Sequence, residues 1–113
     1  MNNSLRAANY IALGLFGIGV IALAIAQPGS AIVGAFNLVP FGLALLAARP
    51  ASTRLAAWAA VISNGLWALL YIGVALVVAM GLGGTPVAIP IAMLIATPCI
   101  LNALSMRNSL KQG

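Results

Sequence analysis

Residues 55–82 read LAAWAAVISNGLWALLYIGVALVVAMGL and contain no charged side chain. The hydrocarbon core of a bilayer is about 30 Å thick and takes about 20 helical residues, so this run is long enough to cross a membrane as one helix. At a rise of about 1.5 Å per residue, it would extend about 42 Å. We therefore expect this helix to tilt or to project beyond the apolar core.

Three further apolar runs, at residues 7–26, 31–48 and 87–106, are each close to the length of one membrane crossing. The chain of 113 residues is 64% hydrophobic and 4% charged, whereas soluble domains carry about 25% charged residues. No run alternates as the strands of a membrane barrel do. The sequence predicts an all-α integral membrane protein, a bundle of four transmembrane helices that forms a single domain over residues 1–113.

The positive charges all fall on one side of this predicted bundle. They precede the first run, separate the second run from the third and follow the fourth: Arg6, Arg49, Arg54, Arg107 and Lys111. The other two connections carry no charge. Because cytoplasmic loops are enriched in Lys and Arg, we expect both termini in the cytoplasm. We expect a multi-pass protein of a bacterial inner membrane.

Two sequence patterns leave alternatives open. An A-x-A motif before the Ala26–Gln27 bond fits a signal-peptide cleavage site, and cleavage there would leave three helices in the same orientation. Three residue pairs share one spacing, which indicates either a parallel repeat of two hairpins or chance placement at loop edges. These pairs are Pro28 and Pro86, Pro40 and Pro98, and Arg49 and Arg107.

The chain contains no Asp, no Glu and no His. These residue types supply many of the general acids and bases of enzymes and most ligands of zinc, iron and magnesium. We therefore predict no enzyme activity, no metal site and no cofactor. Proton-coupled transport by this chain alone is also not expected, because it usually needs an intramembrane carboxylate or histidine. Five cations are too few for a nucleic-acid-binding face.

Polar side chains on three predicted helices share one depth in the membrane. Counted from the cytoplasmic end of each helix at about 1.5 Å per residue, Asn37 lies about 17 Å deep, and Asn64 and Thr97 each lie about 14 Å deep. Pro40 and Pro98 lie just cytoplasmic of this layer. Each proline leaves the carbonyl four residues earlier without its helical donor. Kinked helices with polar groups near the midplane are typical of membrane binding sites.

The third predicted helix adds an aromatic face to this layer. Asn64, Trp67 and Tyr71 follow the spacing of one helix face, and both rings lie too deep for the interfacial aromatic belt. The sequence therefore predicts a ligand site lined by Asn37, Asn64, Trp67, Tyr71 and Thr97 and shaped by Pro40 and Pro98. Hydrogen bonding between helices is the alternative role of the same side chains.

We expect a non-enzymatic protein that binds or passes a small neutral or hydrophobic molecule. An accessory subunit of a larger membrane complex is the main alternative, and a homo-oligomer or a membrane-permeabilising activity also fits the composition. The chain is similar to small four-helix drug exporters in length and hydropathy. It has no counterpart of the essential glutamate in their first helix, so no residue role is carried over and no family is assigned.

Overall fold

The computed structural model describes residues 1–50 and 52–112, and the secondary structure of these residues is entirely helical. The elements in chain order are α1 (Asn3–Ala26), α2 (Pro28–Ala35), the 3₁₀ helix η1 (Phe36–Leu38), α3 (Val39–Ala47), α4 (Arg54–Ala79) and α5 (Ala88–Gln112). Within the described residues, four spans are long and apolar enough to cross a membrane: Asn3–Ala26, Pro28–Ala47, Arg54–Ala79 and Ala88–Lys111. The prediction of an all-helical chain with four helical spans of membrane-crossing length is confirmed.

Side-chain caps fix where two of the spans begin. The Asn2 Oδ1 atom accepts a hydrogen bond from the backbone N–H of Leu5 at 2.7 Å, so α1 starts at Asn3, earlier than the apolar run. The Thr53 hydroxyl oxygen accepts from the N–H of Ala56 at 3.2 Å and starts α4 in the same way. Such caps supply acceptors for N–H groups that the first helical turn leaves unpaired.

Proline and glycine form the two turns that carry no charge. Gln27 leaves the helical conformation, with φ −145° and ψ 78°, and Pro28 starts α2 at a position where no N–H donor is needed. At the end of α4, Gly81 has φ +74°, and the N–H groups of Gly81 and Leu82 donate back to Val78 and Val77 at 3.0 Å. This glycine-terminated cap ends α4 at Ala79, before the end of the predicted run.

The two prolines of the predicted polar layer have different effects on their helices. Pro40 lies in the first turn of α3, directly after the 3₁₀ segment, so the second span is broken into α2, η1 and α3. Pro98 lies inside α5, which continues as a helix on both sides of it. The missing proline donor is therefore accommodated by a change of helix type in one span and within an unbroken helix in the other.

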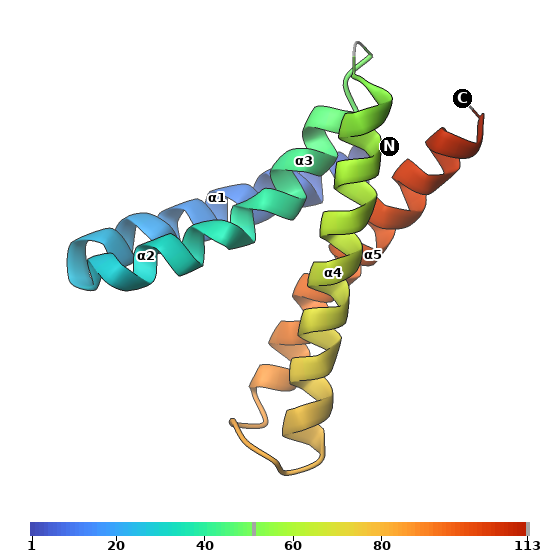
Figure 1. Cartoon of the computed structure of the whole chain (residues 1–113). Coiled ribbons are helices and arrows are strands. Elements are labelled where there is room, and N and C mark those ends of the chain that lie inside the picture. The colour runs from blue at the N-terminus through green and yellow to red at the C-terminus, as the bar shows by residue number, and fades with distance from the viewer. Residues whose placement is uncertain (51, 113) are drawn as a thin grey trace.

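The spans form two hairpins that diverge (Figure 1). One hairpin pairs α1 with α2, η1 and α3, and the other pairs α4 with α5. The hairpins meet near the helix ends that carry the cations, while the α1–α2 turn and the α4–α5 loop point away from each other. The spans therefore contact one another as a bundle at one end only.

Small side chains form the closely packed part of the molecule. The helices α4 and α5 approach each other through buried residues of low volume: Ala57, Ala60, Ala68, Ala75, Ala92, Ala96 and Cys99. Small residues of this kind allow the backbones of two membrane helices to come close. Phe41 of α3 stacks on Phe16 of α1 with ring centroids 5.7 Å apart and joins the first hairpin to this core.

Candidate functional site

Three fully buried asparagines connect the two hairpins, and we call them the asparagine cluster: Asn9 of α1, Asn64 of α4 and Asn102 of α5. Asn9 and Asn102 exchange two hydrogen bonds of 2.7 Å, each amide donating to the side-chain oxygen of the other. Asn102 Nδ2 also donates to Asn64 Oδ1 at 3.0 Å. Asn64 Nδ2 in turn donates to the carbonyl of Pro40 in α3 at 2.9 Å. The cluster thus joins all four spans.

Internal bonding leaves the asparagine cluster no free donor for a ligand. The second donor of Asn64 goes to the carbonyl of Ala60 at 2.8 Å, and the second donor of Asn9 goes to the carbonyl of Leu5 at 3.0 Å. Among the described residues, every buried side-chain nitrogen and oxygen has a partner. An unpaired amide in an apolar interior costs several kcal/mol, so this complete pairing favours one packing of the four spans.

Asn37, Trp67 and Tyr71 form a second group, which we call the Asn37 cluster. The Asn37 Oδ1 atom accepts hydrogen bonds from Trp67 Nε1 at 3.2 Å and from the Tyr71 hydroxyl at 2.5 Å. Asn37 Nδ2 donates to the carbonyl of Gly34 at 3.2 Å. The structure brings these three predicted residues together as contacts between η1 and α4. All three side chains are half-buried, and their role in ligand binding stays a prediction.

Thr97 lies apart from both clusters, on an exposed face of α5. Its hydroxyl donates to the carbonyl of Met93 one turn earlier, at 2.8 Å. Thr97 and Pro98 line a large hollow between α1 and α5, together with residues of α1. The five predicted ligand-binding residues therefore do not share one site: three form the Asn37 cluster, Asn64 belongs to the asparagine cluster and Thr97 faces this hollow.

The hollow is an open groove of about 1030 Å³, which we call the α1–α5 groove. It exists because α1 and α5 touch near their cation-bearing ends and then separate. Most of its lining is aliphatic or aromatic: Leu5, Ala8, Ile11, Ala12, Leu15, Phe16, Phe41, Ile91, Leu94, Ile95, Leu101 and Leu104. Its polar lining consists of Thr97, midway along α5, and of residues near the cation-bearing end: Asn2, Ser4, Ser105 and Asn108.

The α1–α5 groove is uncharged along its whole lining. The Thr97 hydroxyl donates its hydrogen bond to the Met93 carbonyl, but its oxygen can still accept a hydrogen bond from a molecule in the groove. The groove can therefore hold an apolar chain or ring system. Thr97 can accept one hydrogen bond from it midway along the groove, and the polar side chains at one end can contact a polar group. The lining contains no Asp, Glu, His, Lys, Cys or Tyr, and its hydroxyl groups belong to Ser4, Thr97 and Ser105.

Sequence reasoning missed Asn9 and Asn102, which hold the centre of the asparagine cluster. Both lie close to cations along the chain, Asn9 after Arg6 and Asn102 before Arg107. They are therefore too near the helix ends to belong to the layer of polar residues predicted near the midplane. The same depth count, applied to the layer nearer the cations, would have placed both asparagines at similar depth on different helices. Comparison of the chain with family models, curated proteins and solved structures finds no match.

Proposed function

We propose that this chain is a non-enzymatic multi-pass membrane protein that binds a small uncharged amphiphile in the α1–α5 groove. The main support for this proposal is the distribution of polar side chains along the groove. The lining is apolar over most of its length, with one hydroxyl midway and several polar side chains at one end. An amphiphile with an apolar body and a hydroxyl or amide end matches this order. Ligand pockets are commonly apolar with a few placed polar groups.

The direction of the groove in the membrane follows from the cations. Cations lie at the start of α1 and at the end of α5, so the polar end of the groove would face the cytoplasm under the positive-inside rule. We infer that both termini are cytoplasmic and that the membrane is a bacterial inner membrane. A bound amphiphile would then place its polar end at the cytoplasmic interface. Passage through the protein would be passive, because the chain has no Asp, Glu or His to carry a proton.

Photo-crosslinking in phosphatidylcholine nanodiscs tests this proposal. The probe is a monoacylglycerol with a diazirine on its acyl chain, which is uncharged and amphiphilic. We expect adducts on the groove-facing side chains of α1 and α5, including Leu15, Leu94 and Leu101. Adducts spread equally over other exposed faces, such as that of Leu66 and Leu69 on α4, would mean that the probe behaves as bulk lipid and would count against the proposal.

A pair of neighbouring substitutions sharpens the same experiment. Ala8 lines the groove, whereas Ala7 is exposed and lies outside it. Ala8→Trp is expected to lower the adduct yield about fivefold, the effect of about 1 kcal/mol of lost binding free energy, because the indole ring fills part of the groove. Ala7→Trp adds the same ring beside the groove and should leave the yield unchanged. Equal yields from the two variants would contradict the groove as the binding site.

A further inference from the structure

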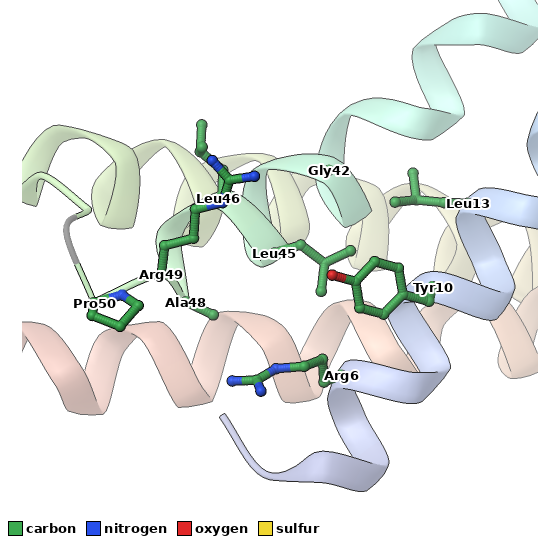
Figure 2. A pocket seen from close by; sticks show the side chains of 9 residues that line it. All are labelled: Arg6, Tyr10, Leu13, Gly42, Leu45, Leu46, Ala48, Arg49 and Pro50. Carbon is green, nitrogen blue, oxygen red and sulfur yellow. The ribbon is translucent and has the colours of Figure 1, made fainter.

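A second hollow, of about 560 Å³, lies on another face of α1, between α1 and α3. Arg6 and Tyr10 of α1 line it, and Arg49, just after α3, lines it from the other side (Figure 2). Leu13 and Leu45 form part of its apolar wall. We call this hollow the arginine pocket. Its volume lies within the range of about 300–1,000 Å³ that is usual for small-molecule sites.

Two arginine residues line the arginine pocket without a side-chain counterion. The chain has five cationic side chains and no Asp or Glu, so neither arginine can pair with a side-chain carboxylate of its own chain. Both arginines are exposed, and among the described residues neither guanidinium donates a hydrogen bond to a protein acceptor. Figure 2 shows the Arg49 guanidinium turned toward Leu46 and away from Arg6, so these two exposed side chains would turn toward the hollow to contact one anion.

The donors of the pocket match a phosphate group. Arginine presents a planar fork of N–H donors that pairs with two oxygens of one phosphate. Figure 2 shows the hydroxyl of Tyr10 beside Leu45, on the α3 side of the hollow, where it can donate a further hydrogen bond to a bound anion. Arg6 and Tyr10 lie on α1 and Arg49 follows the end of α3. Both helices belong to the first hairpin, so binding does not require the two hairpins to move relative to each other.

The apolar wall favours a phosphate that carries acyl chains over free phosphate. Leu13 and Leu45 lie further into the apolar spans than Arg6 and Arg49, on the same pocket. Anionic phospholipids of the cytoplasmic leaflet offer this order of groups, with a phosphate at the interface and acyl chains below it. We propose that the arginine pocket binds the phosphate group of an anionic phospholipid. The pocket is separate from the α1–α5 groove, so either site can be wrong without the other.

Titration of the full chain in neutral detergent tests the site by native mass spectrometry. The probes are dioctanoyl phosphatidylglycerol, dioctanoyl phosphatidylcholine and inorganic phosphate. We expect the phosphatidylglycerol to bind, and Arg6→Gln or Arg49→Gln to weaken its binding about tenfold, the usual effect of one lost charge-assisted hydrogen bond. Arg107→Gln is the matched control, because Arg107 is also exposed and cationic but lies outside the pocket. It should change binding little.

Three results would overturn the proposal. Equal binding of phosphatidylcholine would show that the net anionic charge is not recognised. Competition by inorganic phosphate at the same concentration as the phospholipid would assign the pocket to free phosphate and remove the lipid. An equal loss in Arg107→Gln and Arg6→Gln would mean that only the overall charge matters. Arg6→Lys keeps the charge but not the fork, and we expect it to bind more weakly than the native chain and more tightly than Arg6→Gln.

Discussion

Replacement of Asn102 by leucine is expected to lower the free energy of unfolding by about 2 kcal/mol, at about 0.6 kcal/mol for each of three interhelical hydrogen bonds. The substitution removes both bonds to Asn9 and the bond to Asn64. It also leaves two buried amides with unpaired atoms, which adds to the cost. Reversible unfolding in mixed micelles, at rising fractions of a denaturing detergent, measures the difference.

Two controls identify the cause of that loss. Asn108→Leu is the same change on the same helix at an exposed position, and it should alter stability by less than about 0.5 kcal/mol. The double variant Asn9→Leu, Asn102→Leu should be less destabilised than the sum of the two single variants, because removal of both partners leaves fewer unpaired groups. Additive effects, or a stable Asn102→Leu variant, would mean that the asparagine cluster does not hold the spans together.

Cysteine labelling in intact cells is expected to give an all-or-none pattern. Gly29→Cys places a thiol in the first turn of α2, and Gly83→Cys places one in the α4–α5 loop. Both positions lie at the uncharged ends of the hairpins, and an added side chain meets nothing within 4 Å at either one. Ser109→Cys places a thiol at an exposed position near the cationic end of α5. A membrane-impermeant maleimide should label the first two positions in intact cells and the third only after permeabilisation. The native Cys99 is buried and should stay unlabelled throughout.

The physical reason for this pattern is the charge distribution. Inversion of the protein would carry five cations to the outer side, against the bias that sets the orientation of membrane helices. Labelling of Ser109→Cys in intact cells would contradict the inferred orientation. Partial labelling of all three positions would indicate that the chain inserts in both directions. The first result would place the arginine pocket on the outer side of the membrane. The second would place it on both sides in different molecules.

Apolar run length was enough to predict the helices, because a membrane crossing needs a fixed length of apolar residues. The exact ends depended on local chemistry that hydropathy does not show. Asn2 caps α1 before the apolar run begins, and Gly81 ends α4 before its run is complete. The effects of Pro40 and Pro98 on their helices could not be predicted from the sequence either. The same missing donor gives a 3₁₀ break in one span and an unbroken helix in the other.

The contacts of the predicted site could be anticipated only in part. Depth counting placed Asn37, Asn64 and Thr97 in one layer, but depth along a helix says nothing about the direction in which a side chain points. In the structure, Asn64 points to Asn102, whereas Thr97 points into the α1–α5 groove. Spacing along α4 did place Trp67 and Tyr71 on one face, and both bond to Asn37. Direction requires knowledge of which helices are neighbours, and that knowledge came from the fold.

The groove itself could not be predicted, because it depends on the divergence of two hairpins. Only 6% of the residues in the apolar stretch of α1 are buried within the chain, so most of this helix is left open to lipid, to a ligand or to a partner. A helix of another subunit could fill the α1–α5 groove as well as an amphiphile could. The accessory-subunit alternative is therefore the rival that matters most for the proposed function.

Native mass spectrometry of the protein released gently from its own membrane distinguishes most directly between a ligand and a partner helix in the α1–α5 groove. We predict that the chain is released alone or as a homo-oligomer with a retained small uncharged molecule. Ala8→Trp should lose that molecule, and Ala7→Trp should keep it. Release together with larger, different subunits and without a retained molecule would contradict the account, because the α1–α5 groove would then be a contact surface for a partner helix.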